Sequence, residues 1–304
     1  MASTEFNNLI SELESSDFTP LADLSAERAR FEESTALIPL PAGVDIRELV
    51  EADVRGEWVV TQDAEPEPTG PVVLYMHGGG FTVGSSKTCR SVTCALARQT
   101  SIPVLSIDYG LLPETTHGEA VEDVVRAYRW LRSRGHSPER VALAGDSAGA
   151  TLALAAMLHL RDIEPLPECA YLLSPGADLT DSGWLAPQYP LRDPSMPVSL
   201  MKSVQRDLES TGVGTLHPLV SPLYADLRGL PPLLVQVGGS ERLRDSILRL
   251  AGKARRDGVE VVLQEWDGMF HNWATLSGVL PEADEALGNA SAFLVGRLLQ
   301  EPRG

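Results

Sequence analysis

A serine between two glycines is the strongest chemical signal in this sequence. Ser147 lies two residues from both Gly145 and Gly149, after a short apolar run at residues 141–144 and before an Ala- and Leu-rich run at 150–160. This order predicts a strand, a tight turn and a helix. Such a turn needs small neighbours and points the serine hydroxyl away from the sheet, toward a helix N-terminus that favours negative charge. The pattern therefore predicts a nucleophile, and a glycine-rich turn without chemistry is the alternative.

A second glycine cluster could stabilise the negative charge formed during attack by a serine. Residues 77–80 read His-Gly-Gly-Gly and directly follow the apolar run at 72–76. Glycines leave backbone N–H groups uncovered, and each donor aimed at an oxyanion lowers the barrier by about 3 kcal/mol. A flexible loop is the alternative, but the position after a buried strand favours an oxyanion hole. The expected donors are the N–H groups of Gly79, Gly80 and Ala148.

The serine also needs a general base, and the chain has six histidines. His271 follows the last predicted strand, which places it at the carboxyl edge of the sheet near Ser147. It also comes last in the chain, as the order serine, acid, histidine of an α/β-hydrolase requires. Of the other histidines, His77 in the glycine loop is expected to be structural, and His117 and His136 in polar loops are expected to be solvated. The remaining two are His159 late in a helix and His217 before a proline.

Two acidic residues follow the predicted strand at 233–237, where the acid that orients the base is expected. Glu241 lies in the loop just past the strand, and Asp245 lies one helical turn further on. An acidic residue in the first turn of a helix is already explained by the helix dipole. We therefore favour Glu241, with Asp245 as the alternative. Asp267 also stays open, although it is close in sequence to His271.

The rest of the chain must supply the elements that position these residues. Apolar patterns predict eight strands, at residues 46–52, 57–61, 72–76, 104–107, 141–144, 171–173, 233–237 and 259–266. Helices are predicted at 88–99, 118–134, 150–161, 243–256 and 282–299. Alternating strands and helices indicate an α/β fold with a mostly parallel sheet and helices on both faces.

Two segments fall outside this alternation. Residues 1–42 precede the first strand, contain a short helix after Ser25, and form either a lid or a plain arm. Residues 175–232 are too long for a simple loop and predict a partly helical insertion over the carboxyl edge of the sheet. Its larger apolar side chains either line a pocket or pack the insertion: Trp184, Tyr189 and Met196. We expect one domain, residues 1–304, capped by 1–42 and 175–232.

Composition narrows the partners and the compartment. The 304 residues are 43% hydrophobic and 22% charged, which suits a sizeable core. The net charge of −17 argues against nucleic acid and anionic membranes. The three cysteines are too few for a disulfide framework and indicate a reducing compartment. Without a signal-like N-terminus or a bilayer-length apolar run, the expectation is a cytoplasmic protein.

Together these residues resemble the hormone-sensitive-lipase-like esterases, a bacterial family of α/β-hydrolases with a His-Gly-Gly-Gly loop. The resemblance covers residues 71–273 and rests on the motifs at 77–81, 145–149 and 108–114, although Gly110 stands where an arginine is usual. It implies an α/β-hydrolase fold with a cap built from the N-terminal segment. The implied site residues are Ser147 as nucleophile, His271 as base, and Gly79, Gly80 and Ala148 as oxyanion donors.

Glu241 departs from the family pattern, in which an aspartate is usual. Relatives that resemble epsilon-lactone hydrolases and acetyl hydrolases carry glutamate there, and the runs at 174–179 and 217–223 look closest to that subgroup. Many family members are homodimers, so the resemblance also implies a homodimer.

The expected reaction is hydrolysis of small esters with short- to medium-chain acyl groups through an acyl-enzyme, without metal or organic cofactor. A lactone is a cyclic ester and would use the same residues, whereas an amide needs stronger protonation of its leaving group. The alternative from another class is a non-catalytic ligand-binding protein on a hydrolase scaffold. Related hormone receptors lost the catalytic histidine, but Ser147 and His271 are both present here.

Overall fold

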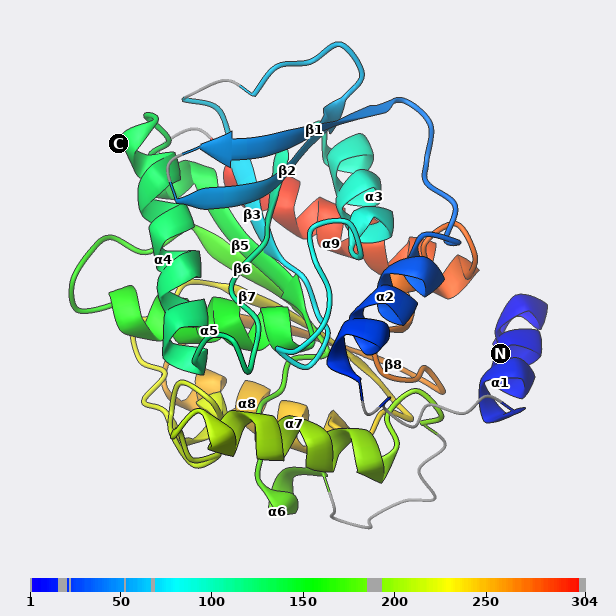
Figure 1. Cartoon of the computed structure of the whole chain (residues 1–304). Helices are drawn as coiled ribbons and strands as arrows, with labels where there is room; N and C mark the ends of the chain where they lie inside the picture. Colours follow the sequence, from blue (N-terminus) through cyan, green and yellow to red (C-terminus); the bar gives the residue numbers. More distant parts are fainter. Residues whose placement is uncertain are drawn as a thin grey trace.

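A computed structural model describes residues 2–15, 21, 23–51, 53–66, 69–184 and 193–300. Within them, eight strands form one sheet in the order β1-β2-β4-β3-β5-β6-β7-β8 (Figure 1). The strands are β1 (Val44–Glu51), β2 (Val54–Thr61), β3 (Val72–Met76), β4 (Val104–Ile107), β5 (Val141–Asp146), β6 (Cys169–Leu173), β7 (Leu233–Gly238) and β8 (Val261–Trp266). The strands from β4 to β8 in that order are parallel, and β2 pairs antiparallel with β1 and β4. The predicted mostly parallel, eight-stranded sheet is confirmed.

The helices that the sequence predicts are also present, with bounds that differ by a few residues at the ends. They are α2 (Leu24–Thr35), α3 (Arg90–Thr100), α4 (His117–Ser133), α5 (Ala148–Leu160), α8 (Arg244–Arg256) and α9 (Pro281–Leu298). The insertion contains α6 (Asp181–Trp184), α7 (Val198–Ser210) and the short 3-10 helix η2 (Pro222–Tyr224), and the N-terminal segment adds α1 (Thr4–Ser15). Two further 3-10 helices are η1 (Pro138–Arg140) and η3 (Trp273–Leu276). Residue 52, the predicted end of the first strand, lies outside the described residues.

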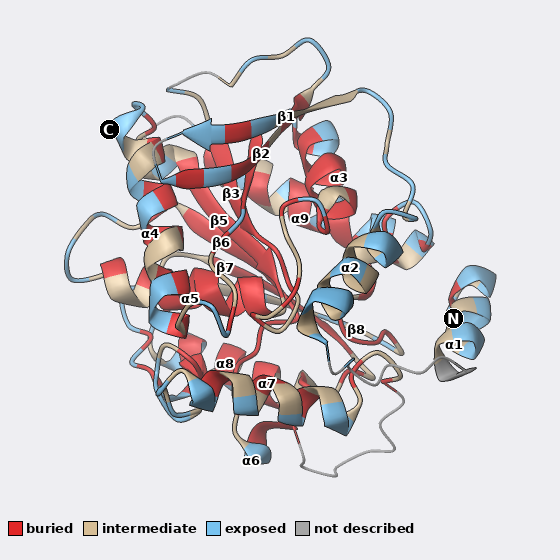
Figure 2. Cartoon of the chain, viewed as in Figure 1, coloured by how far each residue is buried: buried red, intermediate tan, exposed pale blue. Residues whose placement is uncertain are grey.

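Helices cover both faces of the sheet, and β3 shows how. Leu74 packs into the core formed with α4, α5 and α8, whereas its neighbours Val73 and Tyr75 pack into the core formed with α3 and α9. Every residue of β3 is buried, as expected for a parallel strand covered on both sides (Figure 2). The edge strand β1 buries Leu49 and leaves Val50 exposed. Three of the strand ends that carry the site, those of β3, β5 and β7, belong to buried strands of the sheet.

Parallel strands bring their carboxyl ends to one edge of the sheet. The segments that follow these strands contain the predicted site residues: the glycine loop (residues 77–84) after β3, Ser147 after β5, Glu241 after β7, and the base loop (residues 267–272) after β8. The parallel strand order therefore brings segments that are distant in sequence to one edge of the sheet.

Side chains of the insertion contribute to the core. Trp184 and Met196 are buried and pack in the core that α5 and α8 share, while Tyr189 lies outside the described residues. The three cysteines, Cys89, Cys94 and Cys169, are free and buried. Across the described parts of the chain, no helix has both the length and the apolar character that crossing a membrane requires.

Candidate active site

Ser147 occupies a strained turn between β5 and α5, with φ 50° and ψ −117°. A non-glycine residue held in such a conformation costs about 1–3 kcal/mol. The Ser147 N–H donates a 2.9 Å hydrogen bond to the Leu173 carbonyl, which holds the turn. A Cβ on Gly149 would lie 2.0 Å from the Met76 carbonyl oxygen, and one on Gly145 would lie 2.7 Å from the same atom. Both flanking glycines are therefore required by the close approach of β3.

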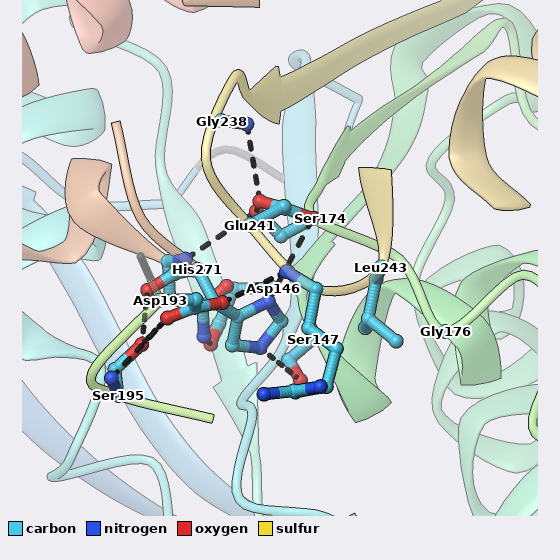
Figure 3. A network of polar contacts seen from close by, with 12 residues as sticks. Asp146, Ser147, Ser174, Gly176, Asp193, Ser195, Gly238, Glu241, Leu243 and His271 are labelled. Atoms are coloured by element: carbon cyan, nitrogen blue, oxygen red, sulfur yellow. Dashed lines mark hydrogen bonds and ion pairs between the residues drawn. The ribbon is translucent and has the colours of Figure 1, made fainter. Parts of the chain in front are cut away.

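His271 reaches Ser147 from the base loop, 124 positions further along the chain. Its Nε2 lies 2.9 Å from the serine Oγ, and the side chain is buried. Figure 3 shows the imidazole facing the hydroxyl. This distance is within the range for proton transfer, so a neutral imidazole can accept the hydroxyl proton.

Glu241 lies fully buried behind the imidazole. Its Oε2 accepts hydrogen bonds from the Ser174 hydroxyl at 2.6 Å and from the Gly238 N–H at 3.0 Å. Its Oε1 faces His271 Nδ1 at 3.8 Å, which is an ion-pair distance rather than a hydrogen bond (Figure 3). Among the described residues neither of these two atoms has a hydrogen-bond partner, so a small shift of the ring can bring them together.

The other two acidic candidates lie elsewhere. Asp245 pairs with Arg244, with 3.0 Å between Oδ1 and Nη1, and Asp267 is exposed. Of the three carboxylates considered from the sequence, Glu241 is therefore the one that faces the imidazole.

Buried charges around His271 set its affinity for a proton. Burial lowers the pKa of His271, but the Glu241 carboxylate, helped by Asp193 and Asp146, outweighs this and the pKa lies above its ordinary value. Burial raises the pKa of Glu241, against the opposing effects of His271 and of its hydrogen-bond donors. The neighbouring carboxylates thus stabilise an imidazolium at His271, while burial works against the charged form of Glu241.

The glycine loop presents backbone donors beside the serine turn. Gly79 and Gly80 have φ values of 115° and 59°, and within the described chain their N–H groups have no hydrogen-bond acceptor. Ala148 is the first residue of α5, and the first N–H groups of a helix lack an intrahelical acceptor. A Cβ on Gly79 would lie 2.1 Å from the Val83 carbonyl oxygen, so only glycine fits there. Among the described residues these three N–H groups are therefore the candidate donors to an oxyanion.

His77 stays within the glycine loop rather than facing the serine. Its ring stacks on Tyr109 with 4.3 Å between centroids, and its Nδ1 lies 2.6 Å from the Gly78 carbonyl oxygen. Burial lowers the pKa of His77 to about 4, so the ring is neutral at neutral pH. The expected structural role agrees with this environment.

The expectation that His117 and His136 are solvated is wrong, because both are buried. His117 opens α4 on the side that faces the core and contacts Phe81 edge-on, with 5.2 Å between ring centroids. His136 is held by the Gly70 carbonyl oxygen, 2.8 Å from its Nδ1. The polar residues around these two histidines suggest exposure, but they do not indicate which side of each segment packs against the protein.

Ser174 and Asp193 also contact residues of the site and were not predicted from the sequence. Ser174 directly follows β6. Glu241 was predicted because it lies just past the end of a strand, and the same reasoning could have predicted Ser174. Asp193 accepts hydrogen bonds from the Arg242 N–H at 2.9 Å and from the Ser195 hydroxyl at 2.7 Å (Figure 3). No sequence signal points to Asp193, because the contacts cross from the insertion to the loop after β7.

Helices α2 and α7 both contact the glycine loop or the segment beside it. Arg28 of α2 donates from Nε to the Thr82 carbonyl at 2.8 Å and from Nη2 to the Leu112 carbonyl at 3.0 Å. Val204 of α7 lies so close that a Cβ on Gly80 would be 2.9 Å from its Cγ2. The N-terminal segment and the insertion therefore both border the candidate site.

Comparison with known proteins gives consistent matches. The chain matches the family described as the alpha/beta hydrolase fold over residues 73–275. It is 42% identical over 242 residues to an acetyl-hydrolase of Streptomyces hygroscopicus, covering 78% of each chain. It is 33% identical over 270 residues to an esterase of Acinetobacter venetianus, covering 88% of each chain.

Solved structures of esterases are similar to this chain over almost its whole length. An esterase from the bacterial hormone-sensitive lipase family is similar with a TM-score of 0.91 and 38% identity, covering 98% of this chain and 99% of that one. A crystal structure of EstE5 soaked with p-nitrophenyl butyrate is similar with a TM-score of 0.88 and 34% identity, covering 98% of this chain and all of that one, 100%.

Proposed function

The chain belongs to the hormone-sensitive-lipase-like esterases of the alpha/beta hydrolase fold, and on this premise we propose that it is a serine carboxylic-ester hydrolase. Ser147 is the nucleophile, His271 the general base and Glu241 the orienting acid. The observation that carries the proposal is the 2.9 Å contact between His271 Nε2 and Ser147 Oγ.

The first half of the reaction forms an acyl-enzyme. Neutral His271 accepts the hydroxyl proton as Ser147 Oγ attacks the ester carbonyl carbon, and the carbonyl π electrons move to the oxygen. The resulting oxyanion accepts hydrogen bonds from the N–H groups of Gly79, Gly80 and Ala148. When the carbon–oxygen bond to the alcohol breaks, the imidazolium returns its proton to the leaving oxygen.

The second half repeats these steps with water. His271 accepts a proton from a water molecule, whose oxygen attacks the acyl carbon, and the same N–H groups bind the second oxyanion. The proton then passes to Ser147 Oγ as the acid product leaves. Throughout, the buried Glu241 carboxylate stabilises the imidazolium and keeps Nε2 directed at the serine.

The substrates we propose are small esters with short- to medium-chain acyl groups. Residues 1–42 and 175–232 form a cap over a single hydrolase domain, and the contacts of Arg28 and Val204 with the glycine-loop region support this. The acetyl-hydrolase relative and the butyrate ester used with EstE5 agree with acyl groups of this size. A lactone would use the same residues and is the second substrate class to test.

The proposal includes a homodimer in a reducing, cytoplasmic compartment. The homodimer rests on the family resemblance, and the compartment on the three free, buried cysteines. The strongly acidic chain, with a net charge of −17, makes nucleic acid an unsuitable partner. Sedimentation analysis of the purified chain tests the oligomer.

The decisive experiment uses p-nitrophenyl esters of increasing chain length, with a lactone alongside. We expect hydrolysis by the parent, a loss on the order of 10⁴–10⁶ in kcat for Ser147→Ala, and an unchanged rate for the exposed control Ser182→Ala. An organophosphate should label Ser147, which a ligand-binding protein without an active base would not allow. A parent that neither hydrolyses esters nor becomes labelled refutes the proposal.

A further inference from the structure

One buried carboxylate joins three segments of the site. Asp146 precedes the serine, and its Oδ1 accepts hydrogen bonds from the Tyr75 hydroxyl at 2.9 Å and the Gly78 N–H at 3.0 Å. Its Oδ2 accepts a hydrogen bond of 2.8 Å from the side-chain amide of Asn272. Asp146 is 4% exposed, so these bonds are protected from water. The same side chain therefore holds β3, the glycine loop and the base loop.

The backbone around this carboxylate is shaped to admit it. A Cβ on Gly78 would lie 2.2 Å from Asp146 Oδ2, so the first glycine of the loop makes room for the carboxylate. Asn272 has a φ of 60°, a left-handed conformation that asparagine tolerates better than most residues. Its carbonyl oxygen accepts hydrogen bonds from the Thr275 N–H at 3.0 Å and the Thr275 hydroxyl at 2.8 Å, which fix the end of the base loop.

We infer that Asp146 and Asn272 are positioning residues that hold the glycine loop and the base loop in fixed positions relative to each other around Ser147. The base loop carries the imidazole, and the glycine loop carries the oxyanion donors. Both must be in place in the same transition state, and a misplacement of about 1 Å can cost on the order of 10²-fold in rate. For its kinetic consequences the inference rests on the proposed function, but the coupling of the two loops can be measured without any substrate.

Asn272→Gly tests the hydrogen bond between Asn272 and Asp146. Glycine keeps the left-handed backbone and removes the side chain that carries the amide, so we expect kcat to fall by about ten- to a hundredfold with little change in KM. Hydrogen exchange followed by mass spectrometry should speed up in peptides from both loops, although the change lies in one of them. The matched control is Asp63→Gly, which alters an exposed left-handed residue at φ 62° outside both loops and should leave the kinetics and the exchange of both loops at parent values.

Asp146→Asn tests the negative charge of Asp146 separately from its hydrogen bond with Asn272. The retained oxygen can still accept from Tyr75 and Gly78. The new NH₂ group faces the Asn272 NH₂ group and can donate to the Asn272 amide oxygen once that amide turns over, because this oxygen has no partner among the described residues. The carboxylates whose charge raises the pKa of His271 are Glu241, Asp193 and Asp146. Removing one of them should move the acid limb of kcat/KM to lower pH. Asp162→Asn removes the same charge from an exposed side chain and should not move it.

The outcomes separate this inference from the proposed function. Faster exchange confined to the base loop in Asn272→Gly, or an unchanged kcat in that variant, overturns the inference. An acid limb that stays in place in Asp146→Asn overturns the expected effect of this charge on the pKa of His271, and the coupling of the loops is then judged on Asn272→Gly. A parent that hydrolyses no ester, while Asn272→Gly still loosens both loops, refutes the function and supports the coupling.

Discussion

The Ser174 hydroxyl donates a 2.6 Å hydrogen bond to Glu241 Oε2, and this bond turns the other carboxylate oxygen toward His271. Ser174 itself has a φ of 47°, a conformation that is costly for a residue other than glycine. In this position Glu241 Oε1 lies 3.8 Å from His271 Nδ1, so a small shift of either side chain would allow a hydrogen bond between them. The Ser174 hydrogen bond thus holds the longer side chain of a glutamate with its carboxylate facing the imidazole.

The acid can be identified by comparing two amide variants. Glu241→Gln should lower kcat on the order of 10³–10⁴-fold, because the imidazolium loses its buried counter-charge and its orientation. Asp245→Asn should have little effect, since Asp245 pairs with Arg244 instead. The measurement is kcat on p-nitrophenyl acetate for both variants. Parent-like activity of Glu241→Gln would remove this residue from the proposed triad.

The rate should depend on pH through His271. The base works only when neutral, so kcat/KM should fall as the pH drops through the pKa of His271 and reach a plateau above it. Because the neighbouring carboxylates raise this pKa above its ordinary value, the midpoint should lie above about 6.5. A pH–rate profile with the background hydrolysis subtracted measures it. A profile that stays flat down to about pH 4 would contradict a histidine base.

Removal of Arg28 should loosen α2. This helix buries no residue fully, so its position depends on polar contacts. They are those of Arg28 with Thr82, Leu112 and Glu114, and a hydrogen bond from the Ser85 hydroxyl to Glu32. Arg28→Ala should raise KM for medium-chain esters by about three- to tenfold and affect kcat less. Arg30→Ala is the matched control, because Arg30 pairs with Glu27 inside the same helix. Equal effects of the two variants would argue against docking through Arg28.

Gly80 and Val204 should show coupled effects. An alanine at position 80 places its Cβ 2.9 Å from Val204 Cγ2 and also strains the left-handed backbone by about 1–2 kcal/mol. Gly80→Ala should therefore lower kcat by about tenfold or more, and adding Val204→Ala should restore part of it. The four rates of this double-mutant cycle on one ester give the coupling. A double variant no better than Gly80→Ala would show that α7 does not press on the glycine loop.

Much of the candidate site could be predicted without coordinates because its signals are local. The glycine pattern around Ser147 specifies a strand-to-helix turn, and apolar runs predict the strands on either side. Since parallel strands end at one edge of the sheet, the positions of Glu241 and His271 just past two of them were enough to expect the three residues together. These inferences need only the order and the spacing of residues along the chain.

Contacts between loops could be found only in the tertiary structure. The hydrogen bond from Asn272 to Asp146 joins residues 126 positions apart, and no pattern in the sequence distinguishes that asparagine from one in any loop. The burial of His117 and His136 likewise depends on which way each segment packs. Side-chain hydrogen bonds depend on distances of a few tenths of an ångström, which are decided when the loops pack against one another, whereas periodicity and glycine spacing specify only the elements that bring the loops near.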